Sequence, residues 1–323
     1  MKKRTKVVAL IIMAAIMLTF IAACGPSDQP TQQQPTPELP PNITPVPGPR
    51  PTVDRLGRPI TLPDFMEEIM TLGPAVTETV AALGFGDRIV ATDDFSYDVP
   101  GLNDGIELFS MMSIDLERIL VLQPDVILAT TMIWAGGGDP LTLISDAGIS
   151  VVYIPVSESI ADIKEDIRFL AAVLDVPERG ESIVSDMQRE IDSIRAIGQT
   201  ITDRRTVYFE ISPVPFMFSF GHGVFLHEMI YLIGAVNVLG DEDAWISVSE
   251  EAILALNPDV ILTNVNFNDD PVGEIMNRPG WEGVTAIING DVYQIDTGSS
   301  SRPTHNIVIA LREMALAVYP EHF

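Results

Sequence analysis

The stretch SIDLERILVLQPDVILAT, residues 113–130, recurs as SVSEEAILALNPDVILTN at residues 247–264. Ten of the eighteen aligned positions are identical, and they include Glu117 and Glu251 as well as the Pro-Asp pair of the turn. The separation between the copies is too long for a solenoid repeat. The duplication therefore predicts two similar lobes, each built around one copy, with a ligand-binding cleft between them.

Each copy predicts a helix, a tight turn and a buried strand. Leu116, Ile119 and Leu120 recur at helical spacing, and the proline of Gln-Pro-Asp or Asn-Pro-Asp ends the helix. Residues 126–131 and 260–265 are apolar runs rich in β-branched side chains, as in strands buried on both faces. A helix that leads into such a strand is half of a parallel βαβ unit. We therefore predict an α/β fold, in which each lobe is a mostly parallel sheet flanked by helices.

The segment between the copies predicts a long connecting helix. Apolar residues keep one helical face through residues 160–174, and Pro177 suits the first turn of a following helix. No proline or glycine interrupts residues 181–197. We expect an N-terminal lobe at residues 52–175, a connecting helix at 176–203 and a C-terminal lobe at 204–323, with limited hinge motion.

The start of the chain predicts a targeting segment followed by a tether. Residues 1–23 combine a basic beginning with a long uncharged run, and Ile21-Ala22-Ala23-Cys24 follows. This pattern resembles the lipobox of bacterial lipoproteins, which implies a lipidated Cys24 and anchoring at the outer face of the cytoplasmic membrane. An uncleaved membrane anchor is the alternative. Residues 24–51 then form an extended tether, because ten prolines follow Cys24 there.

Composition restricts the partners. The formal charge is −26, which argues against nucleic acid and against an anionic membrane surface as partners. Cys24 is the only cysteine of the chain, so an intrachain disulfide is excluded and a thiolate metal cluster is not expected.

Several motifs together resemble the class III substrate-binding proteins of ABC importers. They are the repeated unit, LGPAVTE at 72–78, LGFGDRIV at 83–90, FLHEMIYLIGAVN at 225–237 and WEGVTAIINGDVY at 281–293. The resemblance covers the chain from about residue 65 onwards. It implies a monomeric cell-envelope protein that captures a metal chelate and delivers it to a permease and its ATPase. The chelates of this family are cobalamin, ferric siderophores and haem, and no cofactor of the protein's own is expected.

The same resemblance implies permease-docking residues. One glutamate on each lobe pairs with permease arginines in this family, and by motif these positions are Glu78 and Glu228. A carboxylate facing a guanidinium forms an orientation-fixing, bidentate contact.

Loops at the carboxyl ends of the predicted strands supply the candidate ligand-binding residues. These are Tyr97, Met111, Met112, Trp134, Phe216, His222, Trp245, Phe267 and Arg302. Large apolar and aromatic groups with few polar ones suit a bulky, flat chelate. Arg302 is the main cation among these loops, which are otherwise acidic, so the charge favours a neutral corrinoid over a ferric chelate or haem.

Two other functions remain open from the sequence. His222, His227, Glu228 and His305 allow a site for a bare zinc or manganese ion, although their spacing is not that of a helical pair of ligands. A membrane-anchored hydrolase is the third possibility. The sequence contains no Gly-x-Ser-x-Gly, His-Glu-x-x-His or phosphate-loop motif, so we do not expect an enzyme.

Overall fold

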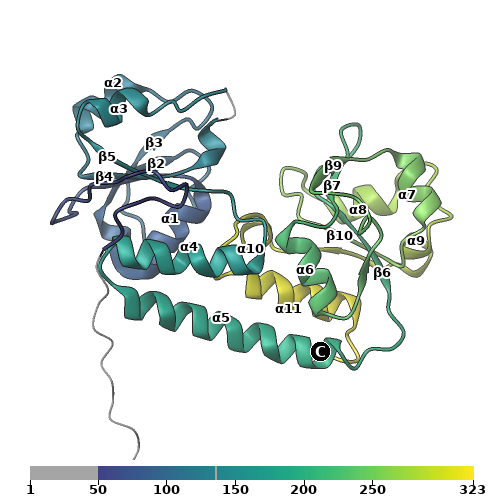
Figure 1. The fold of residues 1–323 in the computed structure, drawn as a ribbon. Coiled ribbons are helices and arrows are strands. Elements are labelled where there is room, and N and C mark those ends of the chain that lie inside the picture. The colour runs from purple at the N-terminus through teal and green to yellow at the C-terminus, as the bar shows by residue number, and fades with distance from the viewer. Residues whose placement is uncertain (1–49, 135–136) are drawn as a thin grey trace, which may run out of the picture. The chain divides into compact units, whose positions relative to one another are not determined.

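The computed structural model describes residues 50–134 and 137–323. The predicted signal peptide, Cys24 and nearly all of the tether lie outside these residues. Among the helices of the described part, none is both long and apolar enough to cross a membrane. Figure 1 shows the described elements with their labels.

The first lobe contains a five-stranded sheet with the strand order β3-β2-β1-β4-β5. All neighbouring strands are parallel. The strands are β1 (Ile69–Leu72), β2 (Ile89–Asp93), β3 (Glu107–Phe109), β4 (Val126–Thr130) and β5 (Ser150–Ile154). One face packs against α1 (Pro74–Val80) and α4 (Ile160–Val173), and the other against α2 (Leu116–Leu122) and α3 (Thr142–Asp146). Because both faces are covered, alternate residues of β4 enter two different cores, and its first four residues are all apolar.

The second lobe contains a four-stranded parallel sheet with the order β11-β10-β6-β8. Its strands are β6 (Thr206–Glu210), β8 (Val236–Asn237), β10 (Val260–Thr263) and β11 (Val292–Gln294). A separate antiparallel pair joins β7 (Phe218–Phe220) to β9 (Trp245–Ser247). The helices are α6 (Phe225–Leu232), α7 (Glu250–Leu256), α8 (Pro271–Met276), α9 (Thr285–Asn289), α10 (Thr297–Ser301) and α11 (Ile307–Val318). The α/β prediction of two lobes with parallel sheets is confirmed.

The two copies of the repeat occupy equivalent places in the two sheets. α2 and β4 form the first copy, and α7 and β10 form the second. Each helix ends at a left-handed residue, Gln123 or Asn257. The aspartate of each turn then accepts hydrogen bonds from the chain entering the neighbouring strand: Asp125 from the backbone of Glu67 (2.8 Å), and Asp259 from the backbone of Thr206 (2.8 Å). Because the aspartate makes the same backbone contact in both lobes, the turn residues recur in both copies along with the apolar ones.

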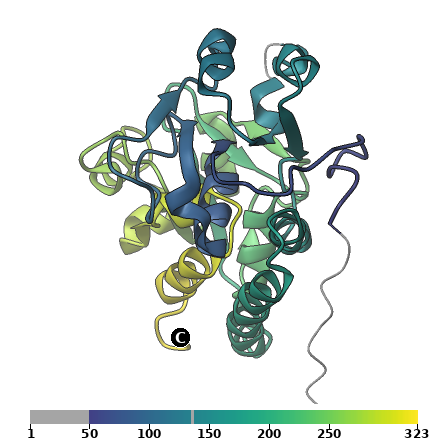
Figure 2. The ribbon, with the colours of Figure 1, turned by 90° about the vertical axis from the view of Figure 1, so that its left-hand side faces the viewer.

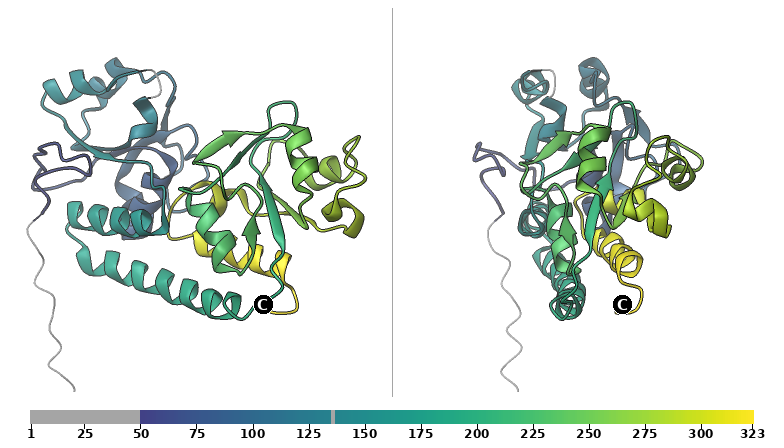
Figure 3. Two further views of the ribbon diagram at one scale, coloured as in Figure 1. Left: turned by 45° about the vertical axis from the view of Figure 1, so that its right-hand side comes forward. Right: turned by 90° about the vertical axis from the view of Figure 1, so that its right-hand side faces the viewer.

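Two helices join the lobes. α5 (Pro177–Gly198) runs beneath both lobes, as Figure 3 shows, and α4 lies against it, as seen nearly end-on in Figure 2. α4 serves two cores, because its Ile160 and Ile163 pack with the second lobe whereas Leu170 and Val173 pack with the first. At its end α5 passes so close to α6 that a side chain on Gly198 would lie 2.2 Å from the Leu232 carbonyl oxygen. This shared packing supports the expectation of limited hinge motion.

Glu78 lies between the two lobes. Its side chain on α1 is 7% exposed and is directed at the second lobe. The carboxylate accepts hydrogen bonds from the hydroxyl of Thr304 and from the amide of Asn306 (2.7 Å), and it lies 3.5 Å from the guanidinium of Arg302. In this structure the carboxylate joins the two lobes, and the docking role of Glu78 stays a prediction.

Glu228 also lies between the lobes. It is half-buried on α6 of the second lobe, and its carboxylate faces the backbone N–H of Ile160 at the start of α4. Burial raises its pKa. Glu228 is therefore an interlobe residue that stays partly exposed, and its docking role remains a prediction.

The Glu78 contacts predict a large effect of truncation. Glu78→Ala would leave Arg302, Thr304 and Asn306 without their shared acceptor, and removing one partner of a buried charged network costs about 3 kcal/mol. We expect the free energy of unfolding, measured by urea denaturation, to fall by about that amount. Glu117→Ala is the matched control, because Glu117 is exposed, and it should change stability by less than about 0.5 kcal/mol. Equal effects of the two variants would contradict the interlobe role of Glu78.

Candidate functional site

A cleft of about 760 Å³ lies between the lobes. In the first lobe it is lined by residues that directly follow strands, such as Gly73 after β1, Phe95 after β2 and Met111 after β3. In the second lobe Asn266 follows β10 and Thr297 follows β11. Ligands of α/β proteins bind beyond the carboxyl ends of strands, so the topology itself places a binding site here.

The cleft brings together five of the nine residues predicted to contact a ligand. These are Tyr97, Met111, Met112, Trp245 and Arg302. The four others are not among the residues that line the cleft in this structure: Trp134, Phe216, His222 and Phe267. Trp134 packs edge-on against Tyr153 (5.2 Å between ring centroids) and beneath Arg58. Phe216 and Phe267 are exposed, and His222 pairs with Asp243 (2.7 Å).

Several lining residues were not predicted. α4 contributes Ile163, Asp166 and Leu170 to the cleft floor. Their helical periodicity indicates burial and cannot distinguish a core from a ligand site. Phe225 and the segment after β5, residues 155–157, also line the cleft. The sequence did hold a signal for that segment, because it directly follows residues 151–154, an apolar run typical of a strand.

The wall formed by the first lobe is apolar and adaptable. It presents Phe95, Tyr97, Met111, Met112 and Met132. Met112 is 79% exposed and Tyr97 71% exposed, so they are open to a ligand. Methionine side chains are flexible and polarizable, and they fit irregular apolar surfaces. This wall suits a large ring system with alkyl substituents.

Trp245 faces that wall from the second lobe and is held in place by other aromatic rings. It lies on β9 opposite Phe220 of β7. Its ring is parallel to that of Phe218 (6.4 Å between centroids) and edge-on to that of Phe220 (5.8 Å). The indole remains 43% exposed. A fixed and partly open aromatic surface can stack on a flat ligand at little cost in side-chain entropy.

The charges of the cleft are largely paired with one another. Arg302, the only Lys or Arg that lines the described cleft, contacts the carboxylates of Asp98 and Glu78. Asp166 pairs with Arg55 (2.7 Å) and accepts a hydrogen bond from Ser157 (2.7 Å), and burial raises its pKa. The cleft therefore offers no cation that lacks a carboxylate partner within the part of the chain that the structure describes.

The histidines proposed as ligands of a bare metal ion do not converge. His222 pairs with Asp243, and the ring of His227, on α6, lies 3.3 Å from the side-chain amide of Asn237, on β8. His305 is largely buried, which lowers its pKa. Among residues 50–134 and 137–323, no three His, Cys, Asp or Glu side chains form a group able to hold a metal ion.

Comparison with known proteins agrees with this architecture. Residues 69–297 match the model of the periplasmic binding protein family. An uncharacterized ABC transporter substrate-binding lipoprotein of Bacillus subtilis, YvrC, is 28% identical over 329 residues, covering 100% of this chain and 99% of the relative. A vitamin B12-binding protein of Pectobacterium carotovorum is 30% identical over 201 residues, covering 61% of this chain and 70% of the relative.

The fold is shared with solved structures. The periplasmic haem-binding protein RhuT of Roseiflexus matches with a TM-score of 0.68 at 24% identity, over 79% of this chain and 99% of that one. The relatives are transport proteins rather than enzymes. The chain belongs to the periplasmic binding protein family, as a substrate-binding protein of an ABC transporter in the group that includes cobalamin-, haem- and iron-chelate-binding members.

Proposed function

We propose that this protein binds a cobalamin-type corrinoid in the cleft and delivers it to an ABC permease. The observation that carries the proposal is the pairing of Arg302 with Asp98 and Glu78 in a cleft that is otherwise apolar. A corrinoid is large, flat and without net negative charge on its ring. It could rest between Trp245 and the methionine wall without requiring a cation.

Charge separates this ligand from its competitors. Haem carries two propionates, and ferric catecholates carry several negative charges. Either would bring anions near Asp98 and Asp166, and the cation that could receive them already has two carboxylate partners. Unpaired like charges in a partly desolvated cleft are costly. A corrinoid avoids this cost, and the similarity to vitamin B12-binding proteins supports the same choice.

The proposal includes the location of the protein. Cys24 would carry the lipid anchor, and the proline-rich tether would hold the binding lobes outside the cytoplasmic membrane as a monomer. The permease and its ATPase are the partners there.

Docking needs accessible carboxylates, and the repeated unit supplies a pair. Glu117 in the first turn of α2 and Glu251 in the first turn of α7 are identical positions of the repeat, and both are exposed. Neither has an ion-pair partner within the described residues. An exposed leucine follows three residues later in each helix, Leu120 and Leu254. The fold does not require exposed residues to be the same in the two copies of the repeat. We therefore propose that these glutamates and leucines contact two equivalent subunits of a permease.

The ligand proposal predicts a selective affinity. The full-length chain, titrated by isothermal calorimetry, should bind cyanocobalamin more tightly than haemin. Trp245→Ala should weaken cyanocobalamin binding by at least about tenfold, because the variant loses the apolar area of the indole and also the stacking contact, which contributes about 0.5–1.5 kcal/mol beyond that area. Phe267→Ala is the control, since that ring is exposed outside the cleft, and it should leave the affinity unchanged. Tighter binding of haemin, or an unchanged affinity of Trp245→Ala, would refute the corrinoid assignment.

The docking proposal predicts a separation of uptake from binding. Glu117→Gln combined with Glu251→Gln should lower cobalamin uptake by cells at least about tenfold, because two charge-assisted contacts are lost. Ligand affinity should stay at its original value. The control is Glu178→Gln, which removes an exposed carboxylate from α5 instead. Normal uptake by the double variant would exclude these residues as docking contacts.

A further inference from the structure

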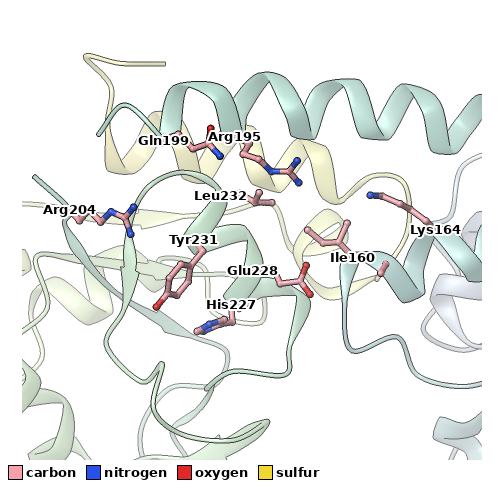
Figure 4. A pocket seen from close by; sticks show the side chains of 11 residues that line it. Ile160, Lys164, Arg195, Gln199, Arg204, His227, Glu228, Tyr231 and Leu232 are labelled. Atoms are coloured by element: carbon pink, nitrogen blue, oxygen red, sulfur yellow. The ribbon is translucent and has the colours of Figure 1, made fainter. Parts of the chain in front are cut away.

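The helix α4 contributes to two separate concave sites. Ile163, Asp166 and Leu170 line the interlobe cleft. Ile160 and Lys164 instead line a groove of about 570 Å³, whose lining side chains Figure 4 shows. Asp166 is therefore a charged residue in the cleft floor, with an apolar lining residue of α4 on each side of it in the sequence.

The Asp166 carboxylate is buried and paired within the protein. The residue is 7% exposed, and Ser157, which also lines the cleft, is 8% exposed. One carboxylate oxygen accepts a hydrogen bond from the guanidinium of Arg55 (2.7 Å), and the other accepts one from the Ser157 hydroxyl (2.7 Å). Burial raises the pKa of Asp166, and both hydrogen bonds act against that rise. Because each oxygen is held by a different donor, the carboxylate has a fixed orientation in the cleft floor.

The cation that pairs with Asp166 does not face the cleft. Arg55 belongs to the segment before β1 and is not among the described residues that line the cleft. Its guanidinium also contacts the carboxylate of Glu165 (3.0 Å). Asp98, the other carboxylate among those lining residues, differs because its partner Arg302 lines the cleft as well. Asp166 therefore presents hydrogen-bond acceptors to the cleft, whereas its own cation stays outside the lining.

Asp166 has acceptor capacity that the protein leaves unused. A carboxylate offers about four lone-pair positions. Within the part of the chain that the structure describes, Asp166 accepts only the hydrogen bonds from Arg55 and Ser157. A ligand group that completes this set must donate hydrogen bonds. It must also lack negative charge, because two carboxylates held close together repel each other strongly in a partly desolvated site. Neutral amide groups meet both conditions.

We propose that Asp166 and Ser157 form a subsite for a primary amide of the ligand, and that this subsite favours amidated corrinoids over corrinoids that carry carboxylates. The proposal rests on the corrinoid proposed above as the ligand and adds which of its groups the cleft recognises. The rim of a cobalamin-type corrinoid carries acetamide and propionamide chains, whose N–H groups can donate to the unused positions of Asp166. The Ser157 oxygen can accept the second N–H of the same amide.

Calorimetric titration of the full-length chain with cyanocobalamin and with its monocarboxylic acids, in each of which a peripheral propionamide is hydrolysed, tests the proposal. We expect at least one of these acids to bind about tenfold or more weakly than cyanocobalamin, because its carboxylate would face Asp166. Asp166→Asn should bring that acid to within about threefold of cyanocobalamin, because a carboxamide can donate to a carboxylate. Arg55 keeps its ion pair with Glu165 in this variant, so we expect the variant to fold, and thermal melting checks this.

Glu165→Gln is the matched control. It removes the neighbouring carboxylate of α4, which also pairs with Arg55 but is not among the described cleft residues, so it should keep the original preference for cyanocobalamin. Equal binding of cyanocobalamin and all of its monocarboxylic acids by the unmodified chain would overturn the proposal, whether or not the variants fold. The same preference in Asp166→Asn as in Glu165→Gln would also overturn it. If the unmodified chain binds no corrinoid at all, the proposed function fails, and the amide subsite fails with it.

Discussion

The buried carboxylate of Glu78 holds the molecule in the arrangement on which its cleft depends. It reaches from α1 of one lobe to Thr304 and Asn306 at the start of α11 in the other. Glu228 faces the start of α4 in the opposite direction, from the second lobe towards the first. Each glutamate therefore sits near the amino end of a helix that belongs to the other lobe, where the helix dipole favours a negative charge. Polar contacts of this kind fix the orientation of the lobes relative to each other. The apolar packing of α4 against the cores of both lobes contributes most of the stabilisation.

The same network also determines the chemistry of the cleft. Arg302 sits between Glu78, which belongs to the lobe contact, and Asp98, which lines the cleft. Its charge is thereby paired with two carboxylates of the protein itself. The selectivity that we propose for a neutral chelate thus follows from how the lobes are joined. A protein with the same fold but a different residue at position 78 would expose a different charge to its ligand.

The sequence predicted the fold well because the repeat couples apolar pattern with turn chemistry. Residues 126–131 and 260–265 became β4 and β10, each one or two residues shorter than expected, and the aspartate of each turn has the same partner type in both lobes. Site residues were harder to predict. A motif gives the identity of a residue but not the direction of its side chain, so the motif could not show that Glu78 and Glu228 lie between the lobes. Trp134 points towards Arg58 rather than the cleft, and the contribution of α4 was hidden within an ordinary amphipathic pattern.

The dual role of α4 has a consequence for how such proteins can be rebuilt. Half of this helix completes the interior of one lobe and half completes that of the other. Neither lobe is thus an autonomous folding module. A first-lobe fragment that stops after β5 would lack the α4 residues of its own core. A second-lobe fragment that begins after α4 would leave the apolar residues that α4 covers exposed to water. Recombination between relatives must carry α4 and α5 together with the surfaces of both lobes that they cover. Because the two halves share these helices, we expect them to unfold together.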